Sequence, residues 1–194
     1  MTADEGFRQA LTAVAAALAE LPVPSMIISG VAVIAAGVPR QTIDIDATLL
    51  GAKSDPEHVL ATFARHQVVP RITDAITFAR ERQVLLLRHE PSRVTIEVSF
   101  AWLAFEEEAL EQAYEIDFQG IRLRVARPED LIVYKAAAWR DRDRSDIERL
   151  LVLHLAQLNL SRVRHLIEQI GRALDDPRRL AAFDQMIERV RNAR

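Results

Sequence analysis

The chain has 194 residues, of which 49% are hydrophobic and 27% are charged, and its formal net charge is −3 at pH 7. This is enough apolar material for one buried core with or without a helical appendix, and the charge is not that of a generally basic nucleic-acid-binding protein. The sequence has no cysteine for a disulfide or thiolate metal site, no apolar run near the roughly 20 residues of a membrane span and no signal peptide, so we expect a cytoplasmic protein without membrane partners.

An amphipathic helix is predicted over residues 4–21, because apolar residues recur there on one helical face. A short, mainly apolar run follows at residues 26–29, before Gly30, and residues 31–36 form a small-residue helical pattern. Ser29 and Gly30 therefore lie at a strand-to-helix turn. A helix N-terminus offers free backbone N–H groups, and glycine permits close approach, so this turn is a candidate phosphate site.

Polar and apolar residues alternate in the next stretch, which predicts a half-buried strand. Thr42, Asp44, Asp46 and Thr48 share one face of this strand. Two neighbouring carboxylates repel each other unless a cation or a shared proton lies between them, and such hard oxygen donors suit Mg²⁺ or Mn²⁺. The alternative is a solvated pair of aspartates at a strand end, which an isolated Asp-x-Asp motif does not exclude.

Two later strands are predicted before the first hairpin. Residues 83–89 contain a continuous apolar run, which indicates a buried strand. Residues 94–100 alternate and place Glu97 at the centre of a polar face. Glu97 is therefore a candidate third metal ligand, the alternative being an exposed glutamate on the solvent side of the sheet. The acidic pair upstream favours the ligand interpretation.

Gln119 and Gly120 separate two further strand segments and indicate a hairpin, and the pattern from Arg127 onward is helical. We therefore expect a mixed α+β fold. Residues 1–126 would form a mixed sheet of about five strands with helices on one face, together with the N-terminal helix. Residues 127–194 would form a C-terminal helical bundle.

Lysine occurs only at positions 53 and 135, while arginine supplies the other basic side chains. Lys135 lies in an apolar helical turn, so it either extends to the surface or points its ammonium at an anion. A helix continuing to residue 146 would align Lys135 with Trp139, Arg142 and Asp146. Because the chain uses arginine at nearly every other basic position, a lysine here indicates that a compact point charge facing an anion is preferred over a planar guanidinium. A salt-bridged, solvated turn is the alternative for residues 140–146.

The segment SGVAVIAAGVPRQTIDID resembles the nucleotidyltransferase superfamily with the polymerase-beta-like fold, whose signature is a Gly-Gly or Gly-Ser turn, a short helix and Asp-x-Asp. It is most similar to the AbiEii toxin-like bacterial nucleotidyltransferases, and the resemblance spans about residues 25–155. One departure is that Ser29-Gly30 reverses the commoner order of the turn.

The resemblance implies a metal-dependent transfer of a nucleoside monophosphate from a nucleoside triphosphate to a hydroxyl, with release of pyrophosphate. Asp44, Asp46 and Glu97 would bind Mg²⁺ or Mn²⁺ and, with Lys135, act in catalysis. The residues expected to bind the nucleotide, ATP or another, are Ser29, Gly30, Arg40, Thr42, Lys135, Arg140, Asp143 and Asp146. The family also implies a toxin–antitoxin or phage-defence role on tRNA with a cognate antitoxin, although the acceptor stays open between tRNA, another RNA, a protein and a small molecule.

Two other classes of protein are compatible with these motifs. A non-catalytic nucleotidyltransferase-fold module or antitoxin partner is favoured by the reversed Ser29-Gly30 order and by glutamate at position 97. A metal-dependent glycosyltransferase also uses Asp-x-Asp with Mn²⁺, but the short chain and the turn upstream disfavour it.

Overall fold

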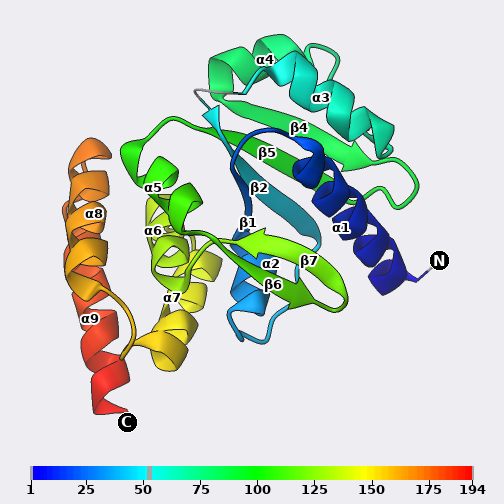
Figure 1. The fold of residues 1–194 in the computed structure, drawn as a ribbon. Helices are drawn as coiled ribbons and strands as arrows, with labels where there is room; N and C mark the ends of the chain where they lie inside the picture. Colours follow the sequence, from blue (N-terminus) through cyan, green and yellow to red (C-terminus); the bar gives the residue numbers. More distant parts are fainter. Residues whose placement is uncertain (1, 52–53, 194) are drawn as a thin grey trace. The chain divides into compact units, whose positions relative to one another are not determined.

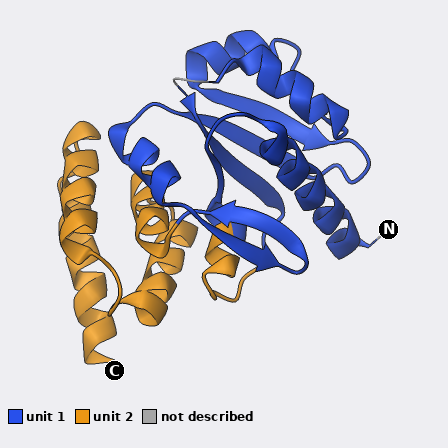
Figure 2. Ribbon diagram, in the orientation of Figure 1, with its two compact units in different colours: residues 1–31, 41–126 blue, residues 32–40, 127–194 orange. Residues whose placement is uncertain are grey.

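The computed structural model describes residues 2–51 and 54–193, which divide into two compact units (Figures 1 and 2). Unit 1 contains residues 1–31 and 41–126, and unit 2 contains residues 32–40 and 127–194. Within the described residues, no helix combines the length and the apolar character that crossing a membrane requires.

Unit 1 is a mixed sheet with helices. Its strands, within the described residues, are β1 (Ser25–Ile28), β2 (Asp44–Leu50), β3 (Val68–Pro70), β4 (Val84–His89), β5 (Thr95–Ala101), β6 (Tyr114–Phe118) and β7 (Ile121–Val125). They pair in the order β3-β4-β5-β2-β1-β7-β6. The β2–β5 and β1–β7 pairs are parallel and the others are antiparallel. The predicted α+β fold is therefore confirmed.

The sheet has seven strands in the described part of the chain, not the five or so that were expected. One reason is β3, which is three residues long and ends at Pro70, so its sequence resembles a turn more than a strand. The β6–β7 hairpin turns at Gln119 and Gly120, as predicted. Both residues have positive φ, at 55° and 82°, as a two-residue type I′ turn requires.

The central strands of the sheet have one apolar and one polar face. In β2, Ile45, Ala47 and Leu49 are fully buried, and each lies beside a buried apolar residue of β5. The apolar face continues into β4 through Leu85 and Leu87. β4 thus has one buried face rather than the two that its continuous apolar run indicated. The opposite face carries the predicted acidic side chains.

The helices of unit 1 are α1 (Ala3–Glu20), the first part of α2 (Ser29–Ala35), α3 (Pro56–Arg65), α4 (Ala75–Arg82) and α5 (Ala104–Gln112). α1 packs on α3, and α3 packs on α4, which makes a helical layer that contacts β7, β3 and β4 (Figure 1). The N-terminus of α1 is capped by Thr2, whose Oγ1 accepts the backbone N–H of Glu5.

Unit 2 is helical. It contains α6 (Pro128–Ala138), α7 (Asp141–His154), α8 (Leu160–Ala173) and α9 (Arg178–Asn192), together with residues 32–40. Arg149 donates to the backbone oxygen of Pro39, and His154 Nε2 lies 2.8 Å from the backbone oxygen of Ala36. These contacts tie residues 32–40 to α7. His154 thus contributes a side-chain contact within this unit.

Candidate functional site

Asp44, Asp46 and Glu97 lie on the polar face of the sheet in unit 1. Asp44 and Asp46 are alternate residues of β2, and Asp46 is the register partner of Glu97 on the parallel neighbour β5. Register partners in a sheet share a face, so the three acids lie on the same side. Ile28, the last residue of β1, is the partner of Asp46 on its other side, which brings the turn at Ser29 beside the acids.

Each acid has a different environment. Asp44 is half-buried, and its Oδ1 accepts the hydroxyl of Thr42 at 2.9 Å, so Thr42 orients the first carboxylate. Asp46 is also half-buried. Glu97 is 49% exposed, and its Oε1 lies 3.0 Å from Nη2 of Arg71. The second and third acids are thus neighbours in the sheet, but Glu97 is held by an arginine.

The donor set suits a hard divalent cation, because Asp44 and Asp46 present carboxylate oxygens from one strand face. In the structure, Oε1 of Glu97 pairs with Arg71. Among the described residues, no three His, Asp or Glu side chains are grouped closely enough to hold one cation. The expected convergence of all three carboxylates is therefore not present in the side chains, although their backbone positions are adjacent.

The turn between β1 and α2 places Ser29 in a left-handed conformation, with φ of 55°. L-residues adopt this conformation at a cost, whereas glycine does so readily. The reversed Ser29-Gly30 order therefore puts the strained conformation on the serine. Non-glycine residues with positive φ are often found at ligand-binding sites, which is compatible with the predicted phosphate contact.

Replacing Ser29 with glycine is expected to raise the free energy of unfolding by about 0.5–1 kcal/mol, because it removes this backbone strain. Ser29→Ala keeps the strain and loses only the hydroxyl, so it should not stabilise the protein. Urea unfolding of the two variants measures the difference. Equal stability of Ser29→Gly and Ser29→Ala would show that the turn is not strained.

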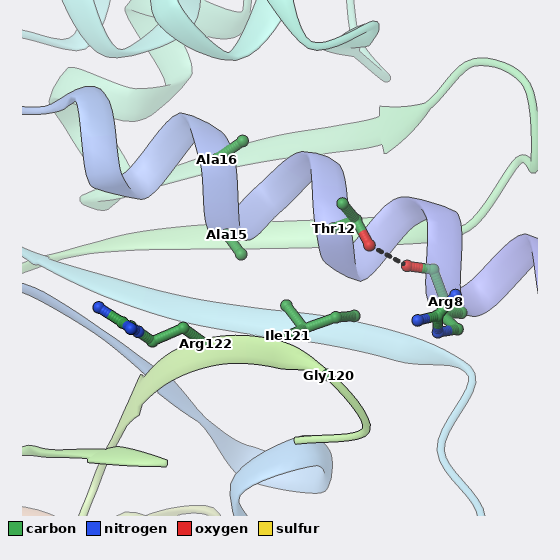
Figure 3. A pocket seen from close by; sticks show the side chains of 7 residues that line it. All are labelled: Arg8, Thr12, Ala15, Ala16, Gly120, Ile121 and Arg122. Atoms are coloured by element: carbon green, nitrogen blue, oxygen red, sulfur yellow. Dashed lines mark hydrogen bonds between the residues drawn. The ribbon is translucent and has the colours of Figure 1, made fainter. Parts of the chain in front are cut away.

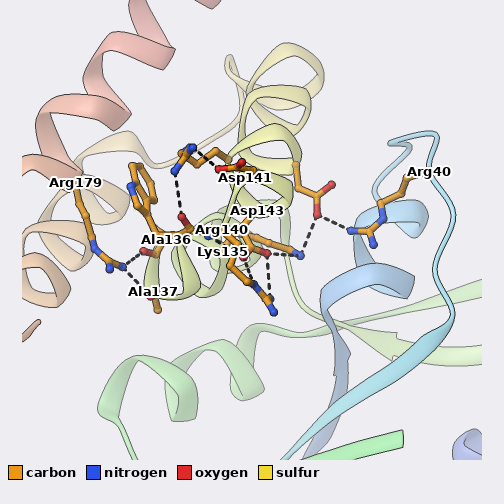
Figure 4. Close-up of polar contacts among 11 residues, drawn as sticks. Arg40, Lys135, Ala136, Ala137, Arg140, Asp141, Asp143 and Arg179 are labelled. Atoms are coloured by element: carbon orange, nitrogen blue, oxygen red, sulfur yellow. Dashed lines mark hydrogen bonds and ion pairs between the residues drawn. The ribbon is translucent and has the colours of Figure 1, made fainter. Parts of the chain in front are cut away.

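The other predicted site residues form an ion cluster in unit 2 (Figure 4). Lys135 Nζ lies 3.1 Å from Asp143 Oδ1 and 3.0 Å from Asp146 Oδ2. Arg40 reaches the same oxygen of Asp146 at 2.5 Å, and Arg140 Nε lies 2.6 Å from Asp143 Oδ2. Lys135 is 3% exposed and Asp143 is fully buried. The cluster therefore holds α6, α7 and residues 32–40 together.

Burial alone would raise the pKa of Asp143, but hydrogen bonds from Arg140 and Lys135 outweigh it and hold the pKa of this carboxyl below its usual range. A depressed pKa means that the folded state favours the charged carboxylate. Asp143 therefore contributes stability above its unfolded pKa of about 3.9, and this contribution is lost as the pH falls through the lower folded value.

The structure revises the interpretation of Lys135. The sequence suggested that its ammonium serves a nucleotide rather than the fold, but the ammonium is the buried partner of two carboxylates in its own unit. The helix does not continue to residue 146, because α6 ends at Ala138 and Trp139 is left-handed, with φ of 57°. The turn at Trp139 is what brings Lys135 to Asp143 and Asp146. Nucleotide binding by this cluster stays a prediction.

Arg179 reinforces the turn at Trp139. Its Nη1 donates to the backbone oxygens of Ala136 and Ala137, and its guanidinium lies 5.8 Å from the centroid of the Trp139 ring (Figure 4). These contacts satisfy carbonyl groups at the C-terminus of α6 that have no helical partner.

A hollow of about 460 Å³ lies away from the acids, between α1 and the β6–β7 hairpin (Figure 3). Its lining includes Arg8, Thr12, Gly120 and Arg122, and it contains no carboxylate. Thr12 is turned back onto its own helix, where its hydroxyl donates to the backbone oxygen of Arg8. The hollow therefore lacks the chemistry of the predicted reaction, and the candidate site is the polar face.

Two arginines near the acids were not predicted. Arg71, just after β3, pairs with Glu97, and Arg88 of β4 shares the polar face through its register partner Thr95. Alternation along residues 84–88 determines the side of the strand on which Arg88 lies, the side of Val84 and Leu86. The continuous apolar run was instead interpreted as a strand buried on both faces, so this position of Arg88 was overlooked.

Solved structures with the same fold include two of ANT(2″)-Ia. The crystal structure in complex with adenylyl-2″-tobramycin has a TM-score of 0.56 and 18% identity, covering 88% of this chain and 99% of that one. The solution structure of this antibiotic-resistance factor has a TM-score of 0.53 and 18% identity, covering 95% and 97%. An antigenic nucleotidyltransferase-like protein from Paracoccidioides brasiliensis has a TM-score of 0.51 and 16% identity, covering 88% and 90%.

A comparison with curated proteins gave no match. Residues 9–191 match the family described as nucleotidyltransferase of unknown function, DUF6036. The match spans nearly the whole chain, including both aspartates of β2, the glutamate of β5 and the helices of unit 2. The chain therefore belongs to the DUF6036 family of nucleotidyltransferases.

Proposed function

We propose that this chain transfers a nucleoside monophosphate from a nucleoside triphosphate to a hydroxyl group, with Mg²⁺ or Mn²⁺ bound by Asp44 and Asp46. The observation that carries the proposal is the acidic polar face, where Asp46 lies between the end of β1 and Glu97. Membership of a nucleotidyltransferase family supports the reaction class.

Each residue of the face would have a separate task. Asp44 and Asp46 would hold the cation, which would neutralise phosphate charge and polarise the phosphoryl group. Thr42 would keep Asp44 oriented through its hydroxyl. Ser29 and Gly30 would hold the phosphates. Glu97, once released from Arg71, would complete the cation site and accept the proton of the attacking hydroxyl.

The bond changes of this reaction balance without a redox partner. The acceptor oxygen would form a bond to the α-phosphorus, and the bond from the α-phosphorus to the β-phosphate oxygen would break. The acceptor proton would leave to Glu97, and pyrophosphate would carry away the negative charge.

The proposal also concerns which molecule carries the acceptor hydroxyl. ANT(2″)-Ia was solved with adenylyl-2″-tobramycin, and at 18% identity it shares only the fold with this chain. The AbiEii-like motif at residues 29–46 favours a toxin acting on tRNA. A small regulatory protein encoded beside this chain, which would be its antitoxin, would support that role.

The test is incubation of the purified protein and Mg²⁺ with each of four α-labelled nucleoside triphosphates, or with labelled nucleotide sugars, in the presence of RNA, protein and aminoglycoside acceptors. We expect label transfer from a triphosphate, with release of pyrophosphate, and its loss when EDTA removes the cation. Consumption of a nucleotide sugar alone would indicate a glycosyltransferase. Nucleotide binding without any transfer would indicate a non-catalytic module.

A further inference from the structure

The polar face continues beyond the acids to two arginines. Across the strands, one row of register partners runs from Asp44 through Thr95 to Arg88. The next row runs from Asp46 through Glu97 to Leu86, whose backbone oxygen accepts the N–H of Arg71. By the usual spacing of strands, β4 lies about 10 Å from β2. Positive charge therefore lies on the Glu97 side of the acids.

The side chain of Arg88 has no hydrogen bond or ion pair within the described part of the chain, and its Nε is buried without an acceptor. Leaving a buried donor unpaired costs on the order of 1–3 kcal/mol, so such groups call for an explanation. The side chain is half-buried rather than solvated on all sides. An anion bound from outside the chain would supply the missing acceptor.

Arg71 has one partner and spare donors. It is 29% exposed and pairs with a carboxylate that is 49% exposed, and a pair of this kind contributes at most about 1 kcal/mol. A guanidinium has five N–H donors, so Arg71 can bind a second anion or exchange Glu97 for one. Its planar fork matches the oxygens of a phosphate.

We infer that Arg71 and Arg88 form a phosphate-binding subsite on the polar face, beside Glu97. The inference rests on the proposed function, because it takes the acids as the reaction centre. The phosphate has two sources, the triphosphate of the nucleotide and a phosphate near the acceptor hydroxyl.

The experiment compares Arg71→Gln, Arg88→Gln and the double variant with Arg122→Gln, a matched control. Arg122 is an exposed arginine on β7 of the same sheet. One arm measures the affinity of Mg²⁺ complexes of ATP, CTP, GTP and UTP. The other arm measures binding of a fluorescent oligoribonucleotide of about ten nucleotides in EDTA, as a function of salt. Melting temperatures are recorded for every variant.

Each single variant should weaken binding about tenfold to a hundredfold in at least one arm, because the substitution removes a charge-assisted hydrogen bond to phosphate. In the oligoribonucleotide arm, the salt slope should fall by about 0.7 for each phosphate that the variant no longer neutralises. Arg122→Gln should match the wild type. Weaker binding confined to the triphosphate arm assigns the subsite to the nucleotide, and weaker binding confined to the oligoribonucleotide arm assigns it to the acceptor.

Unchanged affinity of the Arg71 and Arg88 variants in both arms would overturn the inference. It would also be overturned if the wild type bound neither probe, or if weaker binding occurred only with a large fall in melting temperature. Failure of the wild type to bind any triphosphate contradicts the proposed function separately. In that case, oligoribonucleotide binding that depends on both arginines would still support the subsite.

Discussion

Lys135→Met is expected to destabilise the protein by about 3–5 kcal/mol at neutral pH, which is a large part of the 5–15 kcal/mol typical of a folded domain. The reason is that Asp143 and Asp146 would stay buried after losing the ammonium that lies about 3 Å from each of them. Arg140 and Arg40 would remain as their partners. The measurement is urea unfolding monitored by circular dichroism.

The destabilisation caused by Lys135→Met should be larger at neutral pH than at acidic pH. Asp143 has a depressed pKa in the folded protein, partly because Lys135 donates a hydrogen bond to it. Without Lys135, the folded pKa should rise and the stabilisation that Asp143 supplies above about pH 4 should shrink. The difference between wild type and Lys135→Met should therefore be largest near pH 7 and decrease below pH 4, as the carboxyl of Asp143 becomes protonated.

Two further variants separate charge from geometry in this cluster. Lys135→Arg keeps the charge and should recover part of the stability, although a planar fork does not fit the place of a compact ammonium. Adding Asp146→Asn to Lys135→Met should cost less than the two single changes together, because the residues interact directly. Additive effects would show that Lys135 and Asp146 do not stabilise each other. A Lys135→Met protein as stable as the wild type would show that Lys135 does not stabilise the fold.

Asp46→Asn is expected to lower kcat/KM for nucleotidyl transfer at least about a hundredfold. A catalytic cation supplies several kcal/mol of charge stabilisation, and each 1.4 kcal/mol corresponds to a factor of ten in rate. Asparagine keeps the size of the side chain and removes its charge, so the fold should persist. The matched control is Asp74→Asn, because Asp74 is exposed at the start of α4 and makes no capping hydrogen bond.

Activity of Asp46→Asn within a few-fold of the wild type would exclude this carboxylate from catalysis. The loss of activity in Glu97→Gln can be compared with that in Asp46→Asn, since Glu97 lies next to Asp46 but is bound by Arg71. Its effect should be smaller than that of Asp46→Asn if its main task is to receive the proton. Glu115→Gln, at an exposed position of β6, is the control for a strand glutamate.

The acidic face was predictable from sequence because alternation along a strand determines the side of each residue. Residues 44–48 and 94–100 each alternate, and the parallel register of β2 and β5 brings Asp46 beside Glu97. Alternation does not determine which way a long side chain turns. The sequence therefore could not show that Glu97 is bound by Arg71, a residue 26 positions earlier in the chain.

The ion cluster was not predictable for a different reason. Its formation depends on the left-handed conformation of Trp139, which a tryptophan adopts only when tertiary contacts favour it. A helical pattern that runs through this position puts Asp146 on the same face as Lys135 but about three turns away, and it does not predict the contact with Asp143. The assignment of residues 32–40 to the helical unit is likewise a tertiary effect, carried by contacts of Pro39 and Ala36 with α7.

The central claim is that Asp44 and Asp46 bind the catalytic cation, and Mn²⁺ titration followed by electron paramagnetic resonance tests it without requiring turnover. Relative to a protein-free blank with the same nucleoside triphosphate, wild type and Asp74→Asn should remove additional free Mn²⁺ signal with equal affinity. The Asp44→Asn/Asp46→Asn double variant should bind Mn²⁺ at least about tenfold more weakly while keeping its cooperative thermal unfolding. A folded double variant that binds Mn²⁺ as tightly as the wild type would contradict the claim.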